Sequence, residues 1–313
     1  MNPAPAHKPL VVGIDEGGRS DDALRAALDL SSRLGAELYA VHALPLPFDG
    51  LVLEEDALMA AAAREAVSAD HAAAVREHLL ERLREIAPAA NWQGEKAGER
   101  LRLQPGPPAK VLIEAAHELG ASTIFLGPHR RRGVLDFGST VRAVLSRADG
   151  GVWVQPSRYE VIRRVLVPID LSADSLNALR VACSLARVYK ARVTALHCFV
   201  TPELGYAPGI AYPTPGPTYV LDEVRAGARE EFDKAMETFE WGELEHEWRF
   251  LEGRPAAAVL ELQDAFDLIA LGSHGRTGLS SALLGNVAYR ILKESRKPVL
   301  AIRHPERRYL LGS

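Results

Sequence analysis

Residues 267–271 read Asp-Leu-Ile-Ala-Leu and run directly into Gly-Ser-His-Gly-Arg-Thr-Gly at residues 272–278. The apolar run is typical of a parallel strand buried on both faces. A helical pattern follows from Val287 to Lys293. The order is therefore a strand, a glycine-bearing loop and a helix N-terminus. Because glycines let backbone N–H groups approach a ligand and a helix start favours anions, this stretch predicts a phosphate site.

The chain preceding this stretch is internally repeated. Residues 10–15 read Leu-Val-Val-Gly-Ile-Asp and residues 165–170 read Val-Leu-Val-Pro-Ile-Asp. A predicted helix and a second predicted strand follow each copy. That strand ends in a histidine both times, and one offset of 155 relates Asp15 to Asp170 and His42 to His197. A series of matches at one constant offset predicts two copies of one domain.

Strands that alternate with helices predict a parallel sheet covered on both faces. We therefore expect an α/β protein of two tandem, doubly wound parallel-sheet domains, residues 1–156 and 157–313. Each half closes on a short apolar strand, at residues 151–154 and 298–302. Ligands of such sheets bind beyond the carboxyl ends of the strands, at the point where the strand order reverses. Asp170, His197 and the loop after Leu271 all follow predicted strand ends and should meet there.

The bulk composition excludes several classes of protein. The 313 residues are 47% hydrophobic and 25% charged, which is typical of a globular chain with ample core. A net charge of −4 argues against a nucleic-acid binder that works by bulk charge. No apolar run is long enough to span a bilayer, and no signal segment precedes Leu10. We expect a cytoplasmic protein without membrane or nucleic-acid partners. The two cysteines, Cys183 and Cys198, are expected to pack in the core.

The glycine spacing resembles that of a known family. Two residues separate Gly272 from Gly275, and nine more separate Gly275 from Gly285 and the adjoining Asn286. This is similar to the nucleotide loop of universal stress proteins, Gly-x2-Gly-x9-Gly-Ser/Thr, and departs from it where Asn286 replaces the hydroxyl residue. Residues 163–304 look like a complete domain of that family, and residues 8–156 resemble a diverged copy. The resemblance implies a tandem member with a Rossmann-like, adenine-nucleotide α-hydrolase-like fold.

By this resemblance the second half should bind ATP, or AMP or ADP, and any Mg²⁺ would arrive with the phosphates. Asp170 would lie at the adenine and ribose end, and the backbone around Val200 would contact the base. The expected nucleotide-binding residues are Pro168, Ile169, Asp170, Leu171, Val200, Gly272, His274, Gly275, Arg276, Gly278, Gly285, Asn286 and Val287.

Each of these residues also has a purely structural interpretation. The glycines could serve only to make the turn. Asp170 could cap a helix, although Ser172 could do so instead, and Asn286 could cap a helix or donate its amide to a phosphate. His274 and Arg276 either reach the phosphates or are simply solvated. A role for His197 as a satisfied core residue is at least as plausible as a ligand role.

The corresponding loop of the first half, residues 127–139, departs further from the family pattern. Arg130 stands where the second glycine belongs, and the stretch to Gly138 is two residues shorter. We therefore expect the first domain to bind ATP weakly or not at all. The basic run at residues 130–132 could bind an anion by charge or be an exposed turn.

The function expected overall is a regulatory, ATP-binding role in stress response. We identify no catalytic residues and no metal-ligand cluster. The alternatives are a tandem scaffold that acts through an unknown protein partner, or an enzyme that hydrolyses ATP slowly. Family members pair partly through the closing strand, which implies that residues 152–154 and 299–301 pair within one chain as an intrachain pseudo-dimer. A further homodimer of the whole chain is left open.

Overall fold

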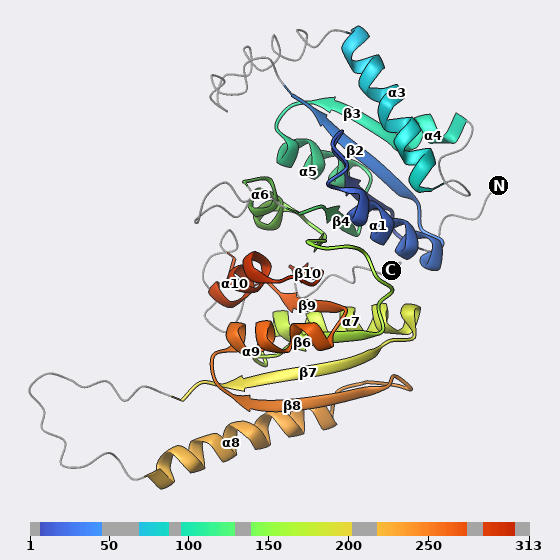
Figure 1. Cartoon of the computed structure of the whole chain (residues 1–313). Helices are drawn as coiled ribbons and strands as arrows, with labels where there is room; N and C mark the ends of the chain where they lie inside the picture. The colour runs from blue at the N-terminus through green and yellow to red at the C-terminus, as the bar shows by residue number, and fades with distance from the viewer. Residues whose placement is uncertain are drawn as a thin grey trace, which may run out of the picture.

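The computed structural model describes residues 7–45, 69–87, 95–128, 139–201, 218–273 and 284–303. These residues form one ten-stranded sheet in the order β3-β2-β1-β4-β5-β10-β9-β6-β7-β8. In Figure 1 the strands are stacked from β3 near the top to β8 near the bottom, with β10 in the middle. The expected architecture of two α/β halves is confirmed.

The first half supplies the strands β1 (Leu10–Gly13), β2 (Leu38–Leu44), β3 (Leu101–Pro105), β4 (Thr123–Leu126) and β5 (Gly151–Val154). Its helices are α1 (Asp21–Leu34), α3 (Ala69–Ile86), α4 (Glu95–Arg100), α5 (Pro108–Glu118) and α6 (Ser139–Arg147). All strand pairs within this half are parallel.

The second half supplies the strands β6 (Arg164–Pro168), β7 (Arg192–Phe199), β8 (His246–Glu252), β9 (Leu268–Gly272) and β10 (Val299–Ile302). Its helices are α7 (Ala173–Tyr189), α8 (Thr218–Glu237), α9 (Pro255–Leu262), the 3-10 turn η1 (Gln263–Ala265) and α10 (Asn286–Glu294). These strands repeat the parallel order of the first half.

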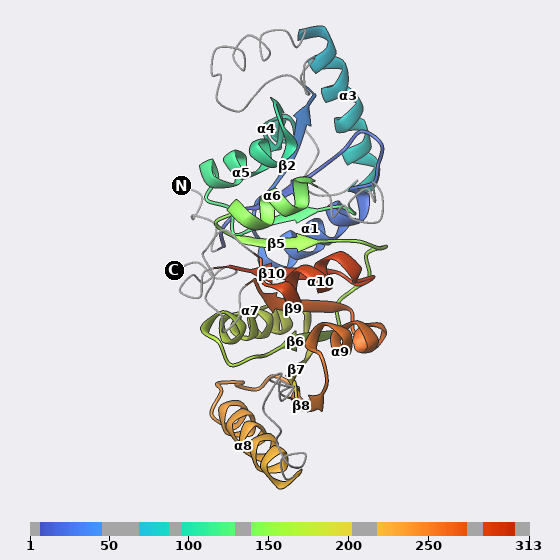
Figure 2. The ribbon, with the colours of Figure 1, turned by 90° about the vertical axis from the view of Figure 1, so that its left-hand side faces the viewer.

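The halves join through the two closing strands, as the family resemblance implies. β5 and β10 pair antiparallel, with Val299 opposite Val154, Leu300 opposite Trp153 and Ala301 opposite Val152. Figure 2 shows β5 directly above β10, with α3 and α8 at opposite ends of the stack. Trp153 is almost completely buried at this junction and stacks on Phe125. An edge strand that pairs in this way leaves no free backbone edge between the halves.

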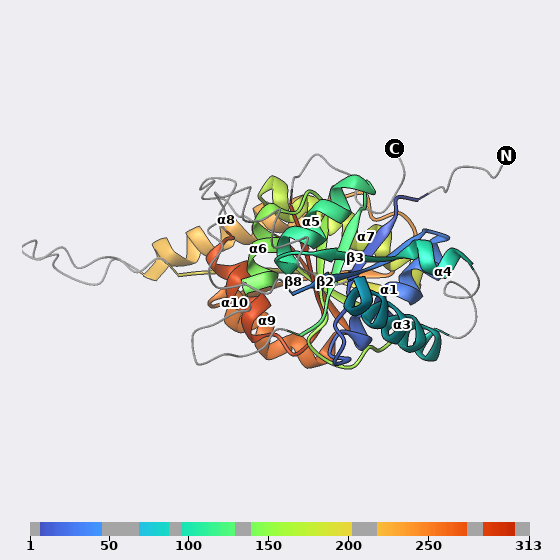
Figure 3. The same cartoon turned by 90° about the horizontal axis from the view of Figure 1, so that it is seen from above.

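Helices cover both faces of the sheet. One apolar core cluster packs α1, α3, α7 and α8 against one face, and a second cluster packs α5, α6, α9 and α10 against the other. Seen along the stack in Figure 3, α6, α9 and α10 lie to the left and α1, α3 and α7 to the right. Burial on both faces explains why β6 and β9 are apolar without alternation.

Some predictions from the sequence need correction or extension. Strands β3 and β8 had no predicted counterpart, and both lie at the outer edges of the sheet. The sequence pattern of residues 222–239 predicts a helix, which is observed as α8, from Thr218 to Glu237. The alanine-rich stretch at residues 57–86 also predicts a helix, of which the structure describes the part from Ala69. Residues 202–217, rich in proline, glycine and tyrosine, predict a loop, and they lie outside the described residues.

The sequence of residues 155–164 predicts a polar linker between the halves, but the segment makes specific contacts. Gln155 is fully buried and accepts a hydrogen bond from the Trp153 indole. The backbone N–H of Tyr159 donates to Asp22 on α1, and the Tyr159 hydroxyl bonds Asp29 on the same helix. The connection is therefore fixed to the first half by specific hydrogen bonds.

Candidate functional site

A cavity of about 360 Å³ opens in the second half where the strand order reverses between β6 and β9. The ends of β6, β7 and β9 and the first turns of α10 form its walls. Seven residues predicted from the sequence line it: Pro168, Ile169, Asp170, Gly272, Gly285, Asn286 and Val287. Residues separated by more than a hundred positions are thus brought to one crevice, in the place expected for a doubly wound sheet.

The remaining predicted residues fall into two groups. Leu171 and Val200 are not among the residues lining the cavity: Leu171 packs against the core, and Val200 is 53% exposed. Their nucleotide contacts stay predictions. His274, Gly275, Arg276 and Gly278 lie outside the described residues, so their roles also stay predictions.

Gly272 is needed for close packing. A Cβ atom added there would lie 2.8 Å from the backbone carbon of Asp174 and 2.9 Å from its oxygen, at the start of α7. In the first half, a Cβ at Gly127 would lie 2.9 Å from the Cα of Ser20, at the start of α1. Both glycines therefore let the first helix approach the fourth strand of its half, which is a structural reason for Gly272 that requires no ligand.

The helix N-terminus at the cavity is built differently from the sequence prediction. Gly285 occupies the N-cap position of α10, Asn286 is the first helical residue, and no side chain caps the helix. The expectation that Asn286 could act as the cap is therefore wrong. The Gly285 N–H donates to the Ser273 carbonyl, which joins the two ends of the intervening loop. The next N–H groups belong to the first turn, which has no acceptors within its own helix and can serve an anion.

Asp170 is held at the cavity by the start of α7. Its Oδ1 accepts hydrogen bonds from the backbone N–H and the hydroxyl of Ser172. Ser172 is the N-cap residue of α7, and its hydroxyl oxygen accepts from the Ser175 N–H. The capping role therefore belongs to Ser172, and Asp170 positions that cap.

We predict that Ser172→Ala lowers the free energy of unfolding by about 1 kcal/mol, because the cap of α7 is lost. Urea denaturation of the purified chain measures this. Ser184→Ala, on the same helix, is the control and should change the stability by less than about 0.5 kcal/mol. Equal effects of the two substitutions would contradict the capping role.

The two strand-end histidines are anchored alike. The Nδ1 of His197 lies 2.8 Å from the Ile169 carbonyl oxygen, and the Nδ1 of His42 lies 2.9 Å from that of Ile14. His197 also stacks on Phe232 and Phe250. This arrangement supports the structural interpretation of His197.

Cys183 is buried as expected, whereas Cys198 is only partly buried and lines the cavity. Burial raises the pKa of the Cys198 thiol to about 11, so it stays protonated at neutral pH.

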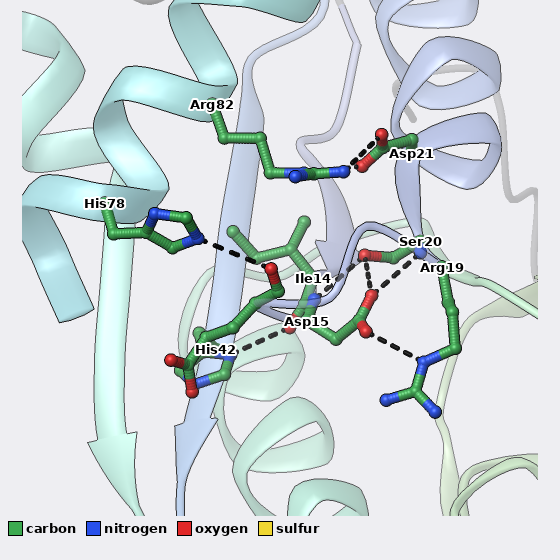
Figure 4. A network of polar contacts seen from close by, with 9 residues as sticks. Ile14, Asp15, Arg19, Ser20, Asp21, His42, His78 and Arg82 are labelled. Carbon is green, nitrogen blue, oxygen red and sulfur yellow. Dashed lines mark hydrogen bonds and ion pairs between the residues drawn. The ribbon is translucent and has the colours of Figure 1, made fainter.

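The first half has a corresponding cavity of about 440 Å³ with different chemistry. Asp15 lines it, but its Oδ1 accepts from the Ser20 N–H and hydroxyl, and its Oδ2 accepts from Arg19 Nε at 3.0 Å (Figure 4). Burial disfavours the carboxylate, yet the hydrogen bonds from Ser20 and Arg19 outweigh it and hold the pKa of Asp15 below its ordinary value. In the second half Asp174 stands where Arg19 stands in the first. The Asp15 carboxylate is already hydrogen-bonded within the protein, by Ser20 and Arg19.

A model of the universal stress protein family matches residues 7–156 and 162–303. The chain belongs to this family. It is a tandem universal stress protein. Over 311 residues it is 26% identical to a universal stress protein of Mycolicibacterium smegmatis, and the match covers 94% of this chain and 96% of that protein. It is 31% identical over 149 residues to the universal stress protein MJ0531 of Methanocaldococcus jannaschii, covering 46% of this chain and 84% of that one.

Solved structures share the fold. The crystal structure of PA1789 from Pseudomonas aeruginosa PAO1, a protein described as functionally unknown, gives a TM-score of 0.61 at 18% identity, over 98% of this chain and 96% of that chain. A universal stress protein from Archaeoglobus fulgidus gives a TM-score of 0.55 at 17% identity, over 94% of this chain and 98% of that chain.

Among the described residues, no helix is long and apolar enough to cross a membrane. That part of the chain also holds no group of three or more His, Cys, Asp or Glu side chains arranged around a metal position.

Proposed function

We propose that the second half of this universal stress protein binds an adenine nucleotide, ATP or its mono- or diphosphate, in the cavity between β6 and β9. The protein would serve stress response by regulation, without rapid turnover. The observation that carries the proposal is the convergence of Asp170, Gly272 and the start of α10 on one cavity. Its volume of about 360 Å³ falls within the range of about 300–1,000 Å³ that small-molecule sites occupy.

The chemistry of the lining suits the two ends of a nucleotide. Asp170 supplies a carboxylate that can accept hydrogen bonds from ribose hydroxyls. The N–H groups at the start of α10 offer donors and a partial positive charge to phosphates. Leu196 and Ile291 add apolar surface to the lining. Mg²⁺, where it takes part, would be carried by the phosphates.

We infer that the first half does not share this activity. In its cavity Arg19 and Ser20 occupy the hydrogen-bonding positions of Asp15, so a ribose would have to displace the Arg19 bond. The two halves would then act as an intrachain pseudo-dimer with one nucleotide site, divided near residue 156. Cytoplasmic location and a homodimer of the whole chain belong to the same proposal.

The test is mass spectrometry of the small molecules released when the purified protein is denatured, alongside a Gly275→Arg variant that copies Arg130 of the first half. ATP, ADP or AMP should be released by the wild-type chain and be absent from the variant. Matching melting temperatures would show that the variant is folded. Calorimetry with ATP should give one site per chain, and two equivalent sites would overturn the assignment of the first half.

Absence of nucleotide from the wild-type chain, together with no ATP binding in calorimetry, would refute the proposal. The scaffold alternative would then hold, and Asn286, which replaces the hydroxyl residue, would be the first position to restore to Ser. Steady phosphate release lost in Gly275→Arg would point instead to slow ATP hydrolysis.

A further inference from the structure

His42 is a buried histidine with one side of its ring unsatisfied. It lies on β2 and is 7% exposed. Its Nδ1 faces the Ile14 carbonyl oxygen, which can only accept, so in the neutral ring the proton sits on Nδ1. The Nε2 atom is buried and meets no hydrogen-bond partner among the described residues. A buried acceptor without a donor is costly, but burial also disfavours a charged ring, so a proton at Nε2 needs a carboxylate beside it.

A carboxylate is placed to meet that proton. Glu16 Oε1 lies 3.6 Å from His42 Nε2, and the Glu16 side chain is 48% exposed. The gap is slightly longer than a hydrogen bond. A proton added from solvent to Nε2 would turn two acceptors into a charge-assisted donor and acceptor pair.

The other charged groups around His42 are already paired. Arg82 on α3 bonds both carboxylate oxygens of Asp21 on α1, at 3.0 and 2.8 Å. Arg19 bonds Asp15 within the β1–α1 loop. His78 on α3 faces the loop too, with its Nε2 3.4 Å from the Glu16 carbonyl oxygen. Figure 4 shows these contacts converging on the loop from α1, α3 and β2. Among the described residues, Glu16 is thus the carboxylate near His42 that forms no ion pair with an arginine, and His78 is the second histidine at the loop.

The second half provides the matching arrangement without the acid. His197 makes the same Nδ1 contact, to Ile169, but Leu171 stands where Glu16 stands in the first half. Its ring stacks on Phe232 of α8 and on Phe250 of β8, which contact each other as well. The same backbone position therefore carries a titratable pair in one half and an apolar stack in the other.

We propose that His42 and Glu16 form a pH-sensitive latch: protonation of His42 Nε2 draws in the Glu16 carboxylate and tightens the β1–α1 loop beneath α3. Because the proton at Nε2 comes from solvent, the latch closes as the pH falls and opens as the pH rises. It acts on the first half and does not depend on nucleotide binding in the second.

Hydrogen exchange on the full-length chain, corrected for the intrinsic pH dependence of exchange, tests the latch. Amides of residues 16–20 and of the middle of α3 should be protected about fivefold more at about pH 5.5 than at about pH 7.5. Residues 171–175 serve as the internal control and should show no such change. Equal protection of residues 16–20 at both pH values would overturn the proposal.

Three variants assign the effect. Glu16→Gln keeps the shape of an exposed side chain and should abolish the pH dependence. His42→Asn keeps a donor near the Ile14 carbonyl and removes the titrating nitrogen, so it should abolish the dependence as well. His78→Gln should retain it. Persistence of the pH effect in Glu16→Gln, or its loss only in His78→Gln, would show that His42 and Glu16 are not the latch.

Discussion

Gly272→Ala should destabilise the protein by about 2–3 kcal/mol, in the range that overpacking of a tight site costs. The added Cβ would lie 2.8 Å from the Asp174 backbone carbon, a distance that real side chains do not adopt. Backbone atoms cannot rotate away as a flexible side chain can, so α7 or β9 must shift. Because β9 lies between β6 and β10 in the sheet and α7 packs on it, the strain should reduce the protection of both elements.

Urea denaturation, with hydrogen exchange in β9 and α7, measures this effect. Gly98→Ala is the matched control: Gly98 lies in α4, and a Cβ there would meet nothing within 4 Å. That substitution should be neutral, or stabilising by up to about 1 kcal/mol through helix propensity. A Gly272→Ala variant as stable as Gly98→Ala would mean that packing is not what requires the glycine.

Much of the fold was predictable because the repeat is carried by buried residues. Strands such as β6 and β9 are apolar on both faces, and one offset of 155 relates the ends of β1 and β2 to those of β6 and β7. The pairing of the closing strands, with Val154 opposite Val299, was implied by the family resemblance. Strands β3 and β8 escaped prediction because edge strands are half-exposed, so their sequences mix charged and apolar residues.

For the candidate site, the residues that meet were predictable, but their contacts were not. Topology brought Asp170, Gly272 and Gly285 together, as expected for strand ends at a switch point. What could not be predicted depends on side-chain contacts. The sequence does not reveal that Arg19 bonds Asp15, or that the backbone of Asp174 fills the space beside Gly272. A comparison of Arg19 with Asp174 at the shared offset was the available signal for the difference between the halves.

The same difference between the halves predicts how substitutions change the affinity for ATP. Asp170→Asn should weaken ATP binding by about 10- to 100-fold, the equivalent of a lost hydrogen bond to a charged group. The amide keeps an acceptor oxygen for Ser172 but replaces the other oxygen with a donor, which a ribose hydroxyl meets less well. Asp15→Asn is the matched control, because Arg19 and Ser20 already occupy that carboxylate.

Calorimetric titration with ATP compares the two variants with the wild-type chain. Asp15→Asn should bind ATP with unchanged affinity and a stoichiometry of one. The double substitution should behave as Asp170→Asn alone, because independent sites add. An equal loss of affinity in both single variants would mean that the halves share the nucleotide, and unchanged affinity in Asp170→Asn would remove the carboxylate from the site. In either case the engagement of Asp15 by Arg19 would no longer explain how two copies of one fold differ in activity.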